Sequence, residues 1–256
     1  MDIKFSPVSF SDIREAVQSH LAALPARIDS FLEKHILASH HYHIFIARQS
    51  AGFASIHGES LLTQFSLTNQ HKRYGQAVFQ QLRKLEHVES AFVPTCDEFF
   101  LAHALDDYRQ LTKQAYFFNV VPYAQDNTTT QSFSLRLANP EDIPFIQQHA
   151  GEFFTPVEKH LAAHTLFLVQ SGNEYVGFGL IESSSLYGDV ASMGMYTIEH
   201  FRRTGIATAT ITLLIEECRR RELHPIAGCW YYNHVSKKTL ERAGMFTQTR
   251  LLKIDY

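Results

Sequence analysis

The feature that constrains the fold most strongly is a series of strand-like and helical segments that occurs twice in the sequence. In residues 133–256, strand-like segments alternate with helical ones, and residues 1–121 show the same order. The two halves also share a turn that follows a strand and opens a helix. Lys72-Arg73-Tyr74-Gly75-Gln76-Ala77 aligns there with Arg202-Arg203-Thr204-Gly205-Ile206-Ala207. The sequence therefore predicts an α/β protein with a mixed sheet, built by a diverged internal duplication.

A stretch with few apolar residues separates the halves. Residues 124–132, AQDNTTTQS, are expected to form a linker between domains over 1–126 and 131–256. The first half is expected to hold strands at 42–49, 60–68, 89–97 and 114–121 and helices at 71–88 and 98–111. The second is expected to hold strands at 133–139, 165–183 (two, joined by a turn), 189–198, 224–232 and 248–256, with helices at 140–151, after 205 and at 235–242.

Bulk composition excludes several classes of protein. With 45% hydrophobic and 19% charged residues among 256, the chain has the composition of a globular protein with a real core. A formal charge of −3 gives no sign of a nucleic-acid partner. The cysteines, Cys96, Cys218 and Cys229, lie far apart, which suits a reducing compartment. Neither a bilayer-spanning run nor a signal peptide is evident, so we expect a cytoplasmic location and no membrane partner.

The turn at residues 202–208 has the chemistry of an anion site. The first N–H groups of a helix have no partner within the helix, and they point towards whatever lies beyond its end. Gly205 and Ala207 let the main chain approach a ligand, and Thr208 adds a hydroxyl. Arg202 and Arg203 supply positive charge where the helix dipole already favours an anion. We therefore expect a diphosphate to bind here; the alternative is an exposed basic cap.

The same residues carry a resemblance to a known family. Residues 133–256 resemble the GNAT superfamily of acyl-CoA-dependent N-acyltransferases, whose signature [Q/R]-x-x-G-x-[G/A] is matched by Arg202-x-x-Gly205-x-Ala207. A second family element, an Asn followed by a small residue and then a Gly-aromatic pair, corresponds to Asn233-x-x-Ser236 and Gly244-Met245-Phe246. The second match is stretched by one residue, because Met245 separates the glycine from the aromatic ring.

The resemblance implies a GNAT fold in which acetyl-CoA is the acyl donor and a primary amine of a small molecule or peptide attacks it directly. The strand before the turn would diverge from its neighbour and bind the pantetheine arm along its edge. Gly194 in that strand is typical of a bulge or bend. The residues expected to bind the coenzyme are Met195, Tyr196, Thr197, Ile198, Arg202, Arg203, Thr204, Gly205, Ile206, Ala207, Thr208, Asn233 and Ser236.

Catalytic groups are less clearly marked than the coenzyme site. The family often places a tyrosine acid seven residues after the Asn, but Leu240 stands there. Tyr231, Tyr232 and His234 are nearby substitutes for this acid, and Glu182, at the end of one predicted strand, is a candidate base. Asp189 could serve as the base instead. A thiol is acidic enough to leave without strong assistance, so the missing tyrosine does not exclude activity.

Two readings of the whole chain remain open. The first is an acetyltransferase whose first half is non-catalytic, acting as a monomer or homodimer. The second is an inactive GNAT-fold protein that regulates others or binds acyl-CoA. His40, His41 and His43 lie close together in the sequence, and His41 and His43 would share a strand face, yet no fourth ligand cluster is evident, so no metal is expected.

Overall fold

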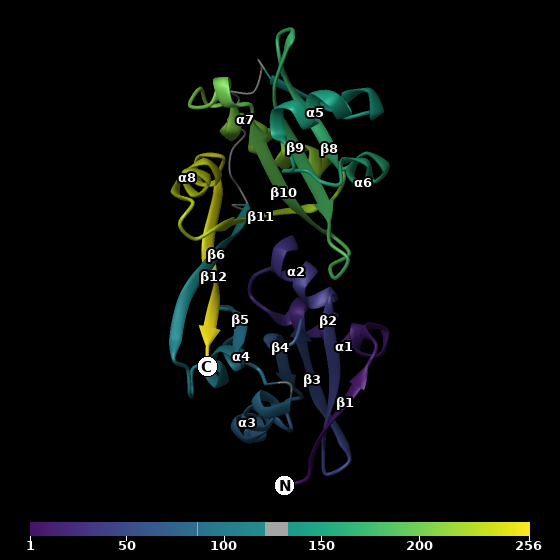
Figure 1. The fold of residues 1–256 in the computed structure, drawn as a ribbon, viewed down its shortest axis with the longest axis vertical. Helices are drawn as coiled ribbons and strands as arrows, with labels where there is room; N and C mark the ends of the chain where they lie inside the picture. The colour runs from purple at the N-terminus through teal and green to yellow at the C-terminus, as the bar shows by residue number, and fades with distance from the viewer. Residues whose placement is uncertain (86, 121–132) are drawn as a thin grey trace.

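A computed structural model describes residues 1–85, 87–120 and 133–256. Its centre is a sheet of 12 strands in the order β1-β2-β3-β4-β5-β12-β6-β11-β10-β9-β8-β7. The sheet runs along the long axis of the molecule, with the second half above the first in Figure 1. Strands β6 and β12 lie at its middle and join the two halves.

The two halves repeat one series of elements, as the duplication predicts. The first consists of β1 (Ile3–Val8), α1 (Phe10–Ala23), α2 (Ser30–Leu37), β2 (Ser39–Ile46), β3 (Gln49–His57), β4 (Leu61–Leu67), η1 (Lys72–Tyr74), α3 (Gly75–Leu85), β5 (Ser90–Pro94), α4 (Glu98–Ala104) and β6 (Gln110–Val120). The second consists of β7 (Phe133–Leu137), η2 (Pro140–Asp142), α5 (Ile143–Ala150), α6 (Val157–Ala162), β8 (Leu166–Ser171), β9 (Glu174–Ser183), β10 (Val190–Thr197), η3 (Glu199–Phe201), α7 (Ile206–Arg220), β11 (His224–Trp230), α8 (His234–Arg242) and β12 (Met245–Asp255).

The halves exchange their last strands. β6 ends the first half but pairs with β11 of the second, and β12 ends the second half but pairs with β5 of the first. Where the two strands meet, Met245 lies opposite Val120 at one end and Asp255 lies opposite Gln110 at the other. This arrangement is that of an approximate two-fold axis through the centre of the sheet. Neither half therefore has a sheet made of its own strands alone.

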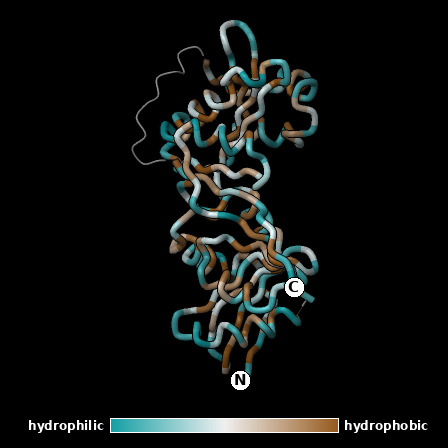
Figure 2. Tube along the Cα trace, turned by 90° about the vertical axis from the view of Figure 1, so that its left-hand side faces the viewer, coloured by the Kyte–Doolittle hydropathy of each residue, from teal (hydrophilic) through white to brown (hydrophobic). Residues whose placement is uncertain are grey.

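Helices cover both faces of the sheet. Apolar residues of α1 and α2 pack on one face, in a cluster that also holds Leu186, Tyr187, Val190 and Ile226 of the second half. Helices α3 and α4 pack on the other face together with Leu252 and Ile254 of β12. Figure 2 shows apolar segments in the strands at the middle of the molecule and polar ones in the outer turns. These two parts of the core are therefore shared between the halves, since each of the two clusters takes residues from both.

Most predicted elements are present, but the structure also holds elements that were not predicted, namely β1, α1, α2 and α6, and it differs from the prediction at three further places. The helix predicted at 98–111 ends at Ala104, because residues from Gln110 onward pair with β12 instead. β3 was not predicted, although it lies at the centre of the first half between β2 and β4. The bulge expected at Gly194 is absent, since Gly194 pairs with Leu180 in unbroken register. The predicted linker and the boundaries at 126 and 131 lie outside the described residues.

Candidate functional site

Strands β10 and β11 separate part-way along their length. They pair in parallel at Val190, Ala191 and Ser192, and β10 then continues to Thr197 along β9 alone. The other edge of β10 from Met193 onward therefore faces a gap rather than a strand. An extended amide-bearing ligand can pair with an open strand edge of this kind.

The turn that follows β10 is shaped for an anion. Gly205 is the N-cap of α7 and has φ +89°, and Arg203 in the same turn has φ +68°. Left-handed conformations of this kind turn successive main-chain N–H groups towards one point. A Cβ at Gly205 would meet no atom within 4 Å, so the main chain there is open to a ligand. The first N–H groups of α7, from Ile206 to Thr208, have no acceptor within the helix.

A cavity of about 700 Å³ joins the gap to the turn. Eleven of the residues predicted to bind the coenzyme line it: Met195, Tyr196, Thr197, Arg202, Arg203, Gly205, Ile206, Ala207, Thr208, Asn233 and Ser236. The side-chain hydroxyl of Thr197 is buried and has no hydrogen-bond partner. An unpaired buried hydroxyl is costly, and a polar ligand in this cavity would remove the cost.

Two of the predicted binding residues lie elsewhere. Ile198 is 2% exposed and packs in the apolar cluster beneath α5 and α6, and its N–H donates to the carbonyl of Val176. The hydroxyl of Thr204 donates to the carbonyl of Phe201, 2.6 Å away, and stabilises the turn from outside the cavity. Ile198 was selected because it continues the strand pattern, which does not reveal where the strand ends.

Asn233 has a structural task of its own. Its side chain accepts a hydrogen bond from the N–H of Ser236 at 3.0 Å, as the N-cap of α8. This cap explains the spacing of Asn233 and Ser236 in the sequence. The N-terminus of α8 is thereby held at the wall of the cavity.

None of the candidate catalytic side chains lines this cavity. Glu182 lies on β9 opposite Ser192 of β10, and it accepts two hydrogen bonds from Nζ of Lys34, at 3.0 and 3.2 Å. Tyr232 is 50% exposed and packs edge-to-face on Trp230. His234 is exposed in the first turn of α8. Their roles stay predictions.

A buried carboxylate that the sequence analysis did not select lies beside the point where β10 and β11 separate. Asp29, from the first half, is 6% exposed, and a Cβ at Gly228 of β11 would collide with its Oδ2. The N–H of the next residue, Ser30, donates to Oγ of Ser192 on β10 at 2.9 Å. Asp29 and Ser30 therefore bridge the two diverging strands. Burial raises the pKa of Asp29 to about 6, although the N–H of Leu32 donates to its other oxygen.

Helix α2 forms a wall of the site beyond Asp29. Glu33 is buried and accepts hydrogen bonds from Oγ of Ser184 at 2.5 Å and from the N–H of Ser185 at 2.6 Å. Lys34 contributes the ion pair with Glu182. The carboxylates of Asp29, Glu33 and Glu182 thus lie on this side of the sheet together with the ammonium group of Lys34.

The equivalent place in the first half is filled. β4 and β5 pair only at Leu61 and Leu62 and then diverge, as β10 and β11 do. Gly75, however, has helical angles with φ −51°, and a Cβ on it would collide with the ring of His103. That ring packs edge-to-face on Phe99 at 4.7 Å, and Phe99 stacks on Phe65. These rings lie beside Gly75, where the second half has open space at Gly205, so the sequence alignment of the two turns does not extend to their geometry.

Two further structural features concern membrane-spanning helices and metal-binding groups. Within the described ranges, no helix is both long and apolar enough to cross a membrane. Across the same residues, His, Cys, Asp and Glu side chains form no group of three or more that could hold a metal ion. His41 instead bonds to Oγ of Ser55 at 2.9 Å, and His43 to Oγ of Ser50 at 2.7 Å.

Comparison with known families agrees with this geometry. A model of the acetyltransferase (GNAT) domain matches residues 9–121, and a model of the acetyltransferase (GNAT) family matches residues 132–245. The chain belongs to the GNAT family. Its two matches follow one another in tandem, as the duplication predicts. A search of curated proteins finds no match.

Solved structures show the same fold over the full length of this GNAT protein. A GNAT-family acetyltransferase from Colwellia psychrerythraea has a TM-score of 0.87 at 17% identity, with 100% of both chains covered. A GCN5-related N-acetyltransferase from Sphaerobacter thermophilus has a TM-score of 0.63 at 12% identity, covering 99% of this chain and 95% of the other. A tandem GNAT protein from the clavulanic acid biosynthesis pathway has a TM-score of 0.61 at 13% identity, covering 100% and 98%.

Proposed function

We propose that the second half transfers an acetyl group from acetyl-CoA to a primary amine of a small molecule or peptide. The observation that carries the proposal is the continuous cavity between the open edge of β10 and the left-handed turn at Gly205. The strand edge suits an amide-bearing arm, and the main-chain anion site suits a diphosphate. The unpaired hydroxyl offers a polar contact between these two parts of the coenzyme.

Each part of the cavity has a distinct task in this proposal. The N–H groups of residues 204–208 would hold the diphosphate, with Arg203 adding charge from the exposed side of the turn. The β10 edge at Met195 to Thr197 would hold the pantetheine arm. The coenzyme supplies an activated acetyl group, and its thiol, with an ordinary pKa of about 8.5, leaves readily. Leu240 in place of a tyrosine is compatible with that step.

We assign the base to Asp29 rather than to Glu182. An attacking amine must be neutral, so a group that takes its proton needs a pKa close to the working pH. Burial brings the pKa of Asp29 to about 6, and its carboxylate lies beside the separation of β10 and β11. Glu182 is held by Lys34 in a solvated ion pair. In this proposal the acceptor amine meets the thioester where β10 and β11 separate, beside Asp29.

The test is an assay of thiol release. Purified protein is mixed with acetyl-CoA and a broad panel of primary amines, and free coenzyme A is measured with a thiol reagent. The proposal expects release with at least one amine and formation of the N-acetyl product by mass spectrometry. Coenzyme binding by calorimetry with no release across the panel would contradict it and favour an inactive protein that binds acyl-CoA.

A further inference from the structure

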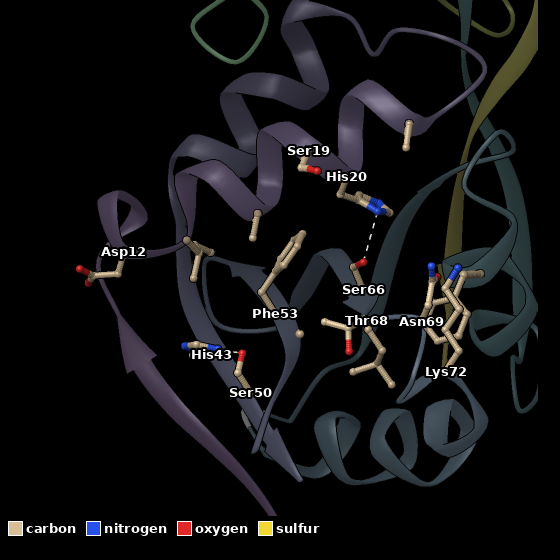
Figure 3. Close-up of a pocket in the computed structure, with 16 residues that line it drawn as sticks. Asp12, Ser19, His20, His43, Ser50, Phe53, Ser66, Thr68, Asn69 and Lys72 are labelled. Carbon is tan, nitrogen blue, oxygen red and sulfur yellow. Dashed lines mark hydrogen bonds between the residues drawn. The ribbon is translucent and has the colours of Figure 1, made fainter. Parts of the chain in front are cut away.

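A second group of side chains in the first half has the arrangement of a catalytic relay. Nδ1 of His20 on α1 lies 3.2 Å from Oγ of Ser66 on β4. Nε2 of the same ring lies 2.8 Å from Oδ2 of Asp97, which follows β5. Figure 3 shows the ring of His20 pointing from α1 towards the Ser66 hydroxyl. The order hydroxyl, imidazole, carboxylate is the one that activates a serine nucleophile.

Such a relay needs a buried carboxylate in a fixed orientation and a hydroxyl that a ligand can reach. Asp97 is 5% exposed, and its Oδ1 accepts from the N–H of Phe100, so its orientation is fixed. An acceptor at Nε2 keeps the proton of a neutral imidazole there, which leaves the lone pair of Nδ1 for the hydroxyl of Ser66. Phe53 holds the ring edge-to-face at 5.9 Å. Ser66 itself is partly exposed.

The hydroxyl opens into a cavity that can hold a ligand. A cavity of about 500 Å³ lies between α1 and strands β2 to β4, and both Ser66 and His20 line it. This volume is within the usual range for small-molecule sites. Phe53, Leu67 and Phe99 give it an apolar wall, and Asn69 and Lys72 add donors at one end. Such donors can stabilise the negative oxygen of an attacked carbonyl.

Asp97 also caps α4, but the fold does not require a hydroxyl at the position of Ser66. Ser66 is the penultimate residue of β4 and pairs with Phe53, whereas Tyr196 is the penultimate residue of β10 and pairs with Phe178. At that equivalent position Tyr196 packs against the ring of Phe153 at 5.3 Å. The second half therefore fills the place with aromatic rings, and the first half fills it with a serine and a histidine.

We propose that Ser66, His20 and Asp97 form a second catalytic site, which cleaves small carboxylic esters through an acyl-serine. Oγ of Ser66 would attack the ester carbonyl while its proton passes to Nδ1 of His20. The bond from the carbonyl carbon to the alcohol oxygen breaks, and the alcohol leaves with the bonding electron pair and takes the proton from His20. Water then attacks the acyl-serine, giving one proton to His20, which returns it to Ser66. The net reaction converts an ester and water into a carboxylic acid and an alcohol.

The experiment uses the full chain without acetyl-CoA, so its result is independent of the acetyltransferase proposal. A fluorophosphonate probe is expected to label wild-type protein at Ser66, as located by peptide mass spectrometry, and p-nitrophenyl acetate is expected to be hydrolysed. Ser66→Ala should lose the label. Asp97→Asn should lower the hydrolysis rate by about 100-fold or more, because it favours the wrong tautomer of His20.

Ser50→Ala is the matched control. Ser50 lies on the same wall and bonds to Nε2 of His43, yet within the described chain His43 has no carboxylate partner. This variant is expected to keep the label. Circular dichroism checks that each variant is folded. If folded wild-type protein takes no label and hydrolyses the ester no faster than Ser66→Ala, the proposal is overturned, and the three side chains serve only to fasten α1 to the sheet.

Discussion

The carboxylate of Asp29 lies against Gly228, so a side chain of the first half occupies the place that a β11 side chain would otherwise take. Glycine is required at residue 228 for this contact, since any Cβ would displace the carboxylate. The contact also explains why Asp29 is buried although it is charged at neutral pH: it caps α2 and closes the site at the same time. A catalytic role and a cost in stability should therefore coincide at this residue.

Replacing Asp29 with Asn is expected to raise stability and lower activity together. Because burial raises the folded pKa of Asp29 to about 6, its stabilising effect is present below about pH 4 and is lost as pH rises through 6. The loss amounts to roughly 3 kcal/mol, at about 1.4 kcal/mol for each pH unit between the two values. Asn keeps the helix cap but carries no charge. Thermal unfolding at pH 4 and pH 7.5 measures the difference, which should appear only at the higher pH.

The rate of acetyl transfer gives the second readout of Asp29→Asn. A lost general base lowers the rate by about 100-fold or more, and the acidic limb of the pH profile near pH 6 should disappear. A variant that gains stability at pH 7.5 but keeps the wild-type rate and profile would leave Asp29 as a buried cap only, and the base would have to be sought elsewhere.

Gly205→Val is expected to abolish coenzyme binding. Valine is strained at φ +89°, by about 1–3 kcal/mol, and its branched side chain would project where the main chain must approach the diphosphate. Gly172→Val is the matched control, because Gly172 has φ +57° in the turn between β8 and β9, also with open space around it. Calorimetry should show lost affinity for Gly205→Val alone. Equal affinity in both variants would remove the turn from the site.

Each chain is expected to bind a single molecule of coenzyme A. In the first half the rings of His103, Phe99 and Phe65 lie beside Gly75, and Gly75 lacks the left-handed angles of Gly205. Titration calorimetry of the full chain gives the stoichiometry. Binding of two molecules per chain would mean that the aromatic side chains move aside, contrary to the assignment of the first half as non-catalytic.

The strand, turn and helix around residues 202–208 could be predicted from the sequence because they form one local unit. Arg202, Gly205 and Ala207 lie within one strand–turn–helix unit, whose conformation depends on residues next to one another. The α/β class and the tandem repeat were predicted for the same reason, from periodicity within short segments. The helix predicted at 98–111 was wrong at its C-terminal end, because Gln110 pairs with Asp255, a residue far away in the sequence.

The contact between Asp29 and Gly228 could not be predicted, because it depends on the exchange of β6 and β12. That exchange brings the two halves into one sheet and places α2 against β11, so that Asp29 meets Gly228. Nothing in a single sequence distinguishes strands that pair within a half from strands that pair across halves. From the sequence alone, Asp29 would be interpreted as a helix cap. His20, Ser66 and Asp97 are too far apart in the chain to suggest a relay.

Thr197→Val is expected to stabilise the free protein and weaken coenzyme binding. The hydroxyl of Thr197 is buried without a partner, and valine replaces it with a methyl group of similar size. Removing an unpaired buried hydroxyl should raise stability by about 1 kcal/mol, whereas losing its bond to a ligand should weaken affinity by about 5-fold. Thermal unfolding with and without coenzyme A measures both effects. An unchanged ligand-induced shift would show that the hydroxyl does not face the ligand.

The exchange of last strands predicts that both halves unfold in one transition. Ile254 lies in the last strand of the second half but is fully buried in the core of the first half. Phe118 lies in the last strand of the first half and packs in the core of the second half. Ile254→Ala should therefore cost about 2–5 kcal/mol and lower the unfolding temperature of the whole chain. Lys253→Ala, on the same strand but with its ammonium group in a surface ion pair, should cost less than about 1 kcal/mol. Two separate transitions by calorimetry, with only one of them shifted in Ile254→Ala, would show that each half folds without the strand of the other.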